Sequence, residues 1–152
     1  MNILFICTGN ICRSPMAEAI AAGCIQNAQP LRNKVRVASA GLYAVVGSDM
    51  SLNSKKALQA MGVAFKRHRA QQLDQSLSEA ADLILCMEAA HVRAIQAAMP
   101  EVAHKVFLLN DHAGLAGDIA DPYGGSEAVY QACAQEIDDA VQRVIGDIEK
   151  NF

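Results

Sequence analysis

The chain carries four short apolar runs, separated by segments with a different periodicity. The runs are NILFIC at 2–7, VRVASA at 35–40, DLILCM at 82–87 and KVFLLN at 105–110. Their length is typical of buried β-strands, and the alternation with helical segments is typical of parallel sheets. We therefore expect a three-layer α/β sandwich, with a four-stranded parallel sheet and helices on both faces.

The segments between the runs carry apolar residues at helical spacings of three and four. These stripes comprise Ala17, Ile20, Ala21, Cys24 and Ile25; Ala57, Leu58 and Met61; Ala90, Val92, Ile95 and Met99; and Val129, Cys133, Ile137, Val141, Val144 and Ile148. The last stripe predicts a long C-terminal helix. At 152 residues the chain fits one domain with one core, so we expect a single domain over 1–152.

Charge and cysteine usage exclude several classes of protein. The formal net charge of -3 provides no basic footprint for nucleic acid. The sequence shows no basic n-region, no long apolar h-region and no stretch of about 18 apolar residues, so we expect a cytoplasmic protein without membrane insertion. The five cysteines are odd in number and lack zinc-ligand spacing. We expect no disulfide framework, no metal and no cofactor.

The first apolar run ends at Cys7, and ligands of open α/β sheets bind beyond the carboxyl ends of the strands. Between Cys7 and Arg13 lie five residues without proline, followed by a helical pattern. A loop of this kind can direct several backbone N–H groups at one centre, next to a helix N-terminus. We expect a phosphate-binding loop, which phosphate-like oxyanions would inhibit.

Individual loop residues suit this task. Gly9 permits a backbone angle that other residues resist, and Asn10 tolerates the left-handed region and can tie the loop together. Ser14 is expected to cap a helix beginning at Pro15 and to donate to a thiolate. The residues expected to surround the substrate phosphate are Thr8, Gly9, Asn10, Ile11, Cys12 and Ser14.

Cys7, Arg13 and Asp121 supply the chemistry of this hypothesis. Backbone N–H dipoles and the Arg13 guanidinium favour thiolate over thiol, which makes Cys7 a nucleophile. Arg13 can bind two phosphoryl oxygens at once. A departing alcohol needs a proton, and Asp121 in ADPYGG is the candidate acid. It lies in the turn-rich segment 111–125, which we expect to overhang Cys7.

Five motifs, in order along essentially the whole chain, resemble the low-molecular-weight protein tyrosine phosphatases. They are CTGNICRSPMAEA from residue 7, SAG at 39–41, HRAQQL at 68–73, DLILCME at 82–88 and ADPYGG at 120–125. The resemblance implies a phosphocysteine on Cys7, phosphate binding by Arg13, and Asp121 as acid and then base.

The same resemblance implies that Asn10 and Ser14 support the loop, and that Ser39 and His68 brace it from behind. The family often has a second tyrosine after Tyr123, where this chain has Gly124, and a second arginine where it has Gln71.

The loop after SAG carries Val45 and Val46, with Tyr43 close by, where many members have an aromatic residue. With Tyr123, these valines are expected to form the walls of the substrate site. Aliphatic residues in this loop make the chain similar to the bacterial branch of the family that is associated with exopolysaccharide tyrosine kinases. The implied partner is a tyrosine-phosphorylated protein, such as a bacterial tyrosine autokinase of polysaccharide export.

Four alternatives remain open. The arginine phosphatase branch resembles this chain but usually has threonine at the position of Ile11. Arsenate reductases of the same fold need two further cysteines in a mobile segment, where only Cys86 is found. A phosphocysteine carrier of a sugar-transport system needs neither Arg13 nor Asp121. A non-catalytic phosphate-binding module would not turn over p-nitrophenyl phosphate.

Cys12 suggests redox control. Only four residues separate it from Cys7, and a loop folded around one phosphate can bring the two within disulfide distance. Cys12 could then trap a Cys7 sulfenic acid before irreversible oxidation. The alternative is that Cys12 packs beneath the loop.

Overall fold

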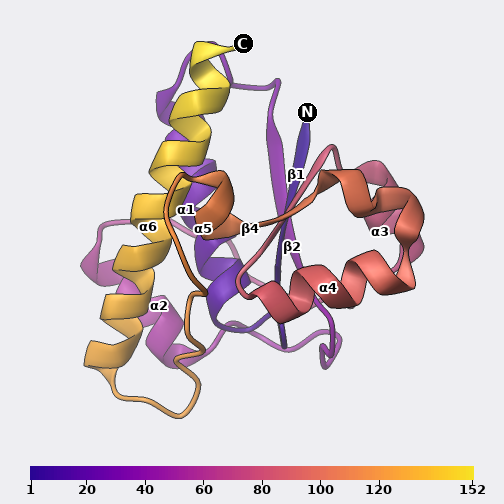
Figure 1. Ribbon diagram of the computed structural model, residues 1–152. Helices are drawn as coiled ribbons and strands as arrows, with labels where there is room; N and C mark the ends of the chain where they lie inside the picture. The colour runs from indigo at the N-terminus through magenta and orange to yellow at the C-terminus, as the bar shows by residue number, and fades with distance from the viewer.

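Four strands form one parallel sheet in the order β2-β1-β3-β4, in a computed structural model that describes residues 1–152. The strands are β1 (Asn2–Cys7), β2 (Arg36–Gly41), β3 (Leu83–Cys86) and β4 (Val106–Leu108). β1 is central and pairs with β2 over its whole length, so that Cys7 lies opposite Gly41. The carboxyl ends of β1 and β2 therefore meet at one edge of the sheet (Figure 1).

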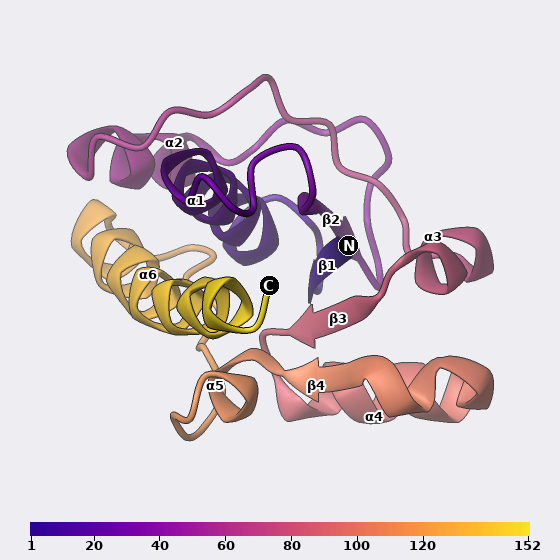
Figure 2. The ribbon, with the colours of Figure 1, turned by 90° about the horizontal axis from the view of Figure 1, so that it is seen from above.

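Helices cover both faces of this sheet, as expected (Figure 2). They are α1 (Arg13–Asn27), α2 (Leu52–Ala60), α3 (Gln75–Ala80), α4 (Ala89–Ala98), the 3-10 helix η1 (Pro100–Lys105), α5 (Leu109–His112) and α6 (Glu127–Lys150). Helices α1, α2 and α6 lie on one side of the sheet, and α3 and α4 lie on the other. No helix combines the length and the apolar character that crossing a membrane requires.

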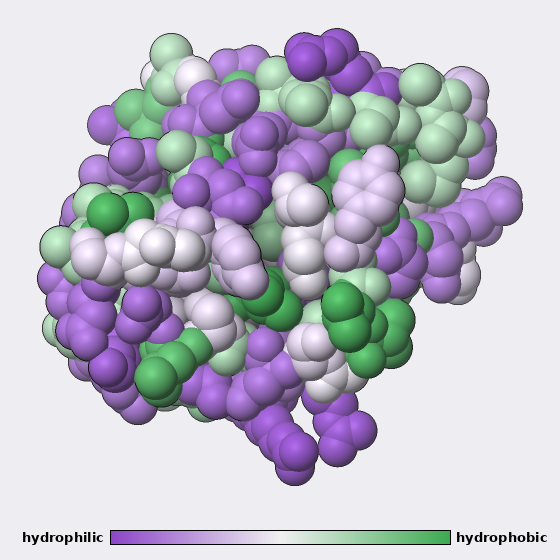
Figure 3. All heavy atoms as spheres, turned by 90° about the horizontal axis from the view of Figure 1, so that it is seen from below, coloured by the Kyte–Doolittle hydropathy of each residue, from purple (hydrophilic) through white to green (hydrophobic).

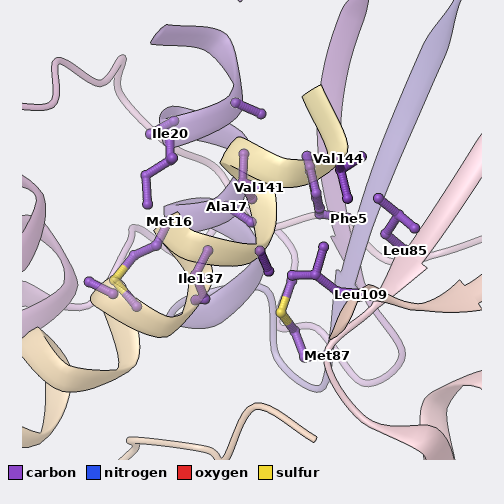
Figure 4. Close-up of a cluster of buried hydrophobic side chains, with 14 of the residues drawn as sticks. Phe5, Met16, Ala17, Ile20, Leu85, Met87, Leu109, Ile137, Val141 and Val144 are labelled. Atoms are coloured by element: carbon purple, nitrogen blue, oxygen red, sulfur yellow. The ribbon is translucent and has the colours of Figure 1, made fainter. Parts of the chain in front are cut away.

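Alternate strand residues feed two separate apolar cores. Ile3, Phe5 and Cys7 of β1 face the larger core, under α1 and α6. Leu4 and Ile6 face the smaller core, which includes Ile95 of α4. This period of two is the one expected for a sheet buried on both faces. Figure 4 shows Met16, Ile20, Ile137 and Val141 of the two long helices in one buried cluster with Phe5, Leu85 and Met87.

The sequence pattern locates every strand but overextends the last one. KVFLLN was expected to be a strand over 105–110, yet β4 ends at Leu108 and the chain turns into α5 at Leu109. The short helices α3, η1 and α5 have too few residues for a detectable stripe. In α4, Ala90 is exposed whereas His91 is buried, so one position of the expected apolar face is wrong.

Candidate active site

The loop between β1 and α1 has its carbonyl groups bonded to the surrounding chain. Four of them accept from residues outside the loop and α1: Cys7 O from Leu42 N (3.1 Å), Thr8 O from Tyr43 N (2.9 Å), Asn10 O from His68 Nε2 (2.6 Å) and Ile11 O from Ser51 N (2.8 Å). The backbone N–H groups of residues 8–12, by contrast, donate to no acceptor within the protein. This division leaves a run of donors for an anion.

A pocket of about 290 Å³ lies where these donors meet the end of β1. Its lining residues are Cys7, Thr8, Gly9, Ile11, Cys12, Arg13, Tyr43, Val45, Ser48, Asp121 and Tyr123. Figure 3 shows the corresponding face of the molecule, where apolar side chains lie among polar ones. Asn10 and Ser14, which we expected to contact substrate, are fully buried and do not line this pocket.

Asn10 adopts the left-handed conformation, with a φ of 57°, as the sequence predicts. Its side chain is fully bonded: Nδ2 donates to Ser14 Oγ (2.8 Å) and Ser39 Oγ (2.9 Å), and Oδ1 accepts from Gln71 N (2.9 Å). Gly9 was expected to supply the freedom for an unusual backbone angle, but its φ is not positive. The loop turns at Asn10, so that expectation was wrong.

The glycine that the loop requires is Gly41, at the end of β2. A Cβ atom at this position would lie 2.7 Å from Thr8 O and 3.0 Å from Asn10 N. Both contacts are with backbone atoms, so no side chain can rotate away to relieve them. This role was not predicted from the sequence, although the pairing of neighbouring parallel strands at their carboxyl ends was the signal that could have revealed it.

Ser14 lies directly beside the Cys7 sulfur, at 2.9 Å. Because Ser14 Oγ accepts from Asn10, its own proton is available to the sulfur, and a hydroxyl proton stabilises a thiolate. Ser39 Oγ, the second acceptor of Asn10, donates to Glu18 Oε1 (2.7 Å). The predicted cap was wrong: α1 begins at Arg13, and its N-cap residue Cys12 makes no side-chain capping bond.

His68 and Gln71 hold the loop from outside, next to Ser39. His68 Nε2 donates to the Asn10 carbonyl, and Gln71 Nε2 donates to the Ser39 carbonyl at 2.9 Å. Gln71, which stands where relatives often have arginine, also bonds Asn10 through its backbone N–H. The structure thus brings Ser39 and His68 together behind the loop and adds Gln71 to them.

The Arg13 side chain is only 1% exposed and has partners on both terminal nitrogens. Nη1 donates to Glu88 Oε2 (2.6 Å) and to the carbonyl of Ile119 (2.7 Å). Nη2 lies 3.4 Å from Thr8 Oγ1 and 3.7 Å from Asp121 Oδ2. Glu88 was not identified from the sequence, although its place directly after β3, at the carboxyl edge of the sheet, was a usable signal.

The loop that carries Asp121 is anchored at its middle. Ile119 N donates to Met87 O (2.9 Å), while Ile119 O accepts from Arg13. Asp118 Oδ1 accepts from Ala89 N at the start of α4. These bonds place Asp121 at the pocket mouth, where its side chain is 47% exposed. The overhang expected for this segment is therefore present.

The walls of the pocket are exposed. Tyr43, Val45 and Tyr123 line it, with exposed fractions of 79%, 75% and 72%. Val46 was expected to join them but does not line the pocket. A hydrogen bond from Ser48 N to Val45 O closes a tight turn here, and Val46 lies within that turn, beyond the wall. Ser48, which the sequence analysis did not single out, lines the pocket instead.

All five cysteines are free thiols. Cys12 Sγ lies 3.4 Å from the Tyr130 hydroxyl and 3.5 Å from Ser51 Oγ, and Cys12 shares the pocket with Cys7. Burial raises the pKa of the Cys86 thiol in β3, and burial also raises the pKa of Cys133 to about 12. Neither buried thiol suits the mobile relay that an arsenate reductase needs.

The sequence matches a family model described as low molecular weight phosphotyrosine protein phosphatase over residues 2–152. A protein-arginine-phosphatase of Geobacillus stearothermophilus is 39% identical over 148 residues, which cover 94% of this chain and 93% of that protein. EpsP of Ralstonia solanacearum, named a probable low molecular weight protein-tyrosine-phosphatase, is 42% identical over 122 residues, covering 80% of this chain and 78% of its own.

The fold is similar to those of solved structures. The crystal structure of a low molecular weight protein tyrosine phosphatase from T. tengcongensis superposes with a TM-score of 0.88 at 36% identity. The superposition covers 97% of this chain and 99% of that one. The two chains therefore share one fold over almost their whole length.

Proposed function

Because this chain belongs to the low molecular weight phosphotyrosine protein phosphatase family, we propose that it hydrolyses phosphotyrosine in proteins through a phosphocysteine on Cys7. One observation carries the proposal. The backbone N–H groups of residues 8–12 have no acceptor in the protein, and four of these residues (Thr8, Gly9, Ile11 and Cys12) line the pocket that also contains Cys7. Such an array binds a tetrahedral oxyanion and presents it to a nucleophile.

In the first step, the Cys7 thiolate attacks phosphorus. The sulfur–phosphorus bond forms as the bond to the phenolic oxygen breaks. Asp121 gives its proton to that oxygen, so tyrosine leaves as a neutral phenol. Ser14, whose hydroxyl faces the sulfur at 2.9 Å, stabilises the thiolate before attack. Arg13 and the backbone N–H groups bind the phosphoryl oxygens throughout.

In the second step, water attacks the phosphocysteine. The Asp121 carboxylate, now deprotonated, takes a proton from this water, and the sulfur–phosphorus bond breaks. Inorganic phosphate leaves and the thiolate is restored. The exposure of Asp121 suits both steps, because its carboxyl group must reach a leaving group first and a water molecule second.

The pocket walls favour an aromatic phosphoester over phosphoarginine. Ile11, Val45 and the two tyrosines present mainly apolar surface to a substrate. A phenyl ring needs no hydrogen bonds along its length, whereas the guanidinium group of phosphoarginine carries N–H donors that need acceptors. The similarity to an arginine phosphatase keeps phosphoarginine as the second candidate, with Asp121 as the acceptor nearest the pocket mouth.

Hydrolysis of two matched peptides, one with phosphotyrosine and one with phosphoarginine, tests the choice. Wild type should prefer phosphotyrosine by at least about tenfold in kcat/KM, a difference of about 1.4 kcal/mol. Ile11→Thr, which adds one acceptor to the wall, should narrow that preference, with Ile11→Val as the control of similar shape. A wild-type preference for phosphoarginine would reverse the assignment.

The natural substrate is a tyrosine-phosphorylated protein, for which a bacterial tyrosine autokinase of polysaccharide export is the candidate. Support comes from the aliphatic Val45 on the wall and from the similarity to EpsP. Asp121→Ala should retain bound phosphoprotein because the leaving group cannot be protonated. Mass spectrometry of the proteins retained by this variant, with Arg13→Ala as the control, identifies the partner. Retention of the same proteins by both variants would argue against substrate trapping.

Cys12 protects the nucleophile in this proposal. Hydrogen peroxide oxidises the Cys7 thiolate to a sulfenic acid, and the Cys12 thiol condenses with it, forming a disulfide and releasing water. Both residues line one pocket, which supports the pairing. After peroxide treatment, thiol reductant should restore wild type more completely than Cys12→Ser. Equal recovery would leave Cys12 with a packing role only.

A further inference from the structure

His91 is buried beneath the active site, on the first turn of α4. Its residue exposure is 6%, and its Nδ1 atom is the one buried side-chain polar atom without a hydrogen-bond partner in the protein. A buried polar group without a partner costs free energy and usually reflects another constraint. The contacts of the other ring nitrogen reveal that constraint.

Nε2 lies 3.0 Å from Thr8 Oγ1 and 3.6 Å from Glu88 Oε2. These two oxygens are also the neighbours of the two terminal nitrogens of Arg13: Glu88 Oε2 accepts from Nη1 at 2.6 Å, and Thr8 Oγ1 lies 3.4 Å from Nη2. Arg13, Glu88, His91 and Thr8 thus form a closed ring of contacts. His91 is the member of this ring that approaches both partners of the guanidinium.

The proton of His91 can be assigned from these partners. A carboxylate only accepts hydrogen bonds, so a bare lone pair on Nε2 would face Glu88 Oε2 at 3.6 Å with no proton between them. This contact favours the proton on Nε2, which then donates to Thr8 Oγ1. Nδ1 is then a bare lone pair, which is the less costly atom to leave unpaired in the interior. Burial lowers the pKa of His91 and favours this neutral form; Glu88, Asp118 and Asp121 oppose the effect, whereas Arg13 adds to it.

We propose that His91 is a positioning residue that fixes the Arg13 guanidinium by holding Thr8 and Glu88 on either side of it. A planar guanidinium binds two phosphoryl oxygens only if its plane is held at the right angle. Glu88 restrains Nη1, and Thr8 restrains the Nη2 that faces the pocket. Without His91, the Thr8 hydroxyl is free to rotate and Nη2 loses its fixed neighbour.

The inference rests on the proposed function, but its test does not depend on turnover. In the Cys7→Ser background, inorganic phosphate binding is measured by calorimetry for His91→Leu, His91→Gln and Thr8→Val. Gln places an amide nitrogen close to the position of Nε2, so it keeps the donor, whereas Leu keeps only volume. His112→Gln is the matched control, because His112 packs against Phe107 and lines a different pocket, which shares no residue with the active site.

His91→Leu and Thr8→Val should each weaken phosphate binding by about two- to tenfold, the range of one hydrogen bond. The double variant should bind no more weakly than either single variant, because both break the same contact. His91→Gln should bind within about twofold of the background, since the donor is kept. His112→Gln should have no effect, and kcat/KM for p-nitrophenyl phosphate in the Cys7 enzyme should follow the same order.

Equal losses in His91→Leu and His91→Gln would show that His91 only fills space, and multiplied losses in the double variant would show that it acts independently of Thr8. Either result overturns the inference. If His91→Leu does not fold, Thr8→Val and His91→Gln decide the question. Wild type that binds phosphate but hydrolyses no phosphoester would contradict the proposed function while leaving the ring in place.

Discussion

The floor and the walls of the pocket are held in different ways. On the floor and directly beneath it, Arg13, Asn10 and Ser14 are at most 1% exposed, and every one has side-chain hydrogen bonds. On the walls, Tyr43 and Tyr123 are more than 70% exposed, and no hydrogen bond holds either side chain. The reacting atoms are thus fixed before substrate arrives, whereas the walls depend on substrate for most of their contacts.

This contrast predicts its largest effect at the nucleophile. Cys7→Ser should abolish turnover, because a serine hydroxyl in this pocket has no base to activate it. It should still bind inorganic phosphate, because the backbone N–H groups are unchanged. Steady-state assays and calorimetry on the same preparation separate the two. Appreciable turnover by this variant would exclude the phosphocysteine intermediate.

Asp121 lies between the floor and the walls of the pocket. The loss of rate when it is substituted should depend on the leaving group of the substrate. Asp121→Asn should slow phosphotyrosine hydrolysis by roughly 10²- to 10⁴-fold, the usual contribution of a general acid. Aryl phosphates whose phenols leave without a proton should be slowed much less. A series of substituted phenyl phosphates gives the dependence, and an equal effect on every member would exclude Asp121 as the acid.

Gly41 tests whether the floor depends on backbone contacts beneath it. Gly41→Ala should destabilise the protein by about 1–3 kcal/mol, because the new methyl group overlaps backbone atoms of the loop. It should also weaken phosphate binding. Gly23→Ala is the control, since a Cβ there meets nothing within 4 Å. Urea unfolding of both variants is the measurement, and equal stabilities would mean that the loop adapts freely.

On the walls, effects should be smaller and confined to binding. Tyr123→Ala should raise KM for aryl phosphates by about two- to tenfold through lost stacking, with little change in kcat. Tyr123→Phe, which keeps the ring, serves as the control. A KM unaffected by the loss of this ring would assign the aromatic wall to Tyr43 instead.

The smallest effect concerns pH and the buried part of the site. Burial lowers the pKa of His91 below its ordinary value of 6.5, so the unfolded chain takes up a proton that the folded protein resists. The neutral His91 therefore lowers the free energy of unfolding by nothing above pH 6.5. As the pH falls from 6.5 toward the folded-state pKa of His91, the unfolded chain gains a proton and the folded protein loses stability relative to it. His91→Gln should therefore show a shallower decline of Tm between pH 7 and 5 than wild type. Parallel curves would mean that His91 titrates alike in both states.

The sequence predicted the floor better than the walls, for physical reasons. Cys7, Arg13 and the left-handed Asn10 belong to one short segment, whose spacing alone defines an anion loop. Gly41, Glu88 and His91 come from other elements, and their roles depend on strand register and helix docking, which a local pattern does not contain. Val46 was misplaced because a tight turn follows Val45, and periodicity gives no signal there.

The partners of Arg13 also determine when the site can form during synthesis. Its guanidinium bonds Glu88 and Ile119, which lie 75 and 106 residues further along the chain. Since the chain is made from its N-terminus, the cysteine loop is available early, but the groups that orient its arginine are made much later. A nascent chain therefore carries the Cys7 thiol before the Arg13 guanidinium is oriented to stabilise its reactive thiolate form. Contacts of such long range also slow folding, so activity appears only after most of the domain has assembled.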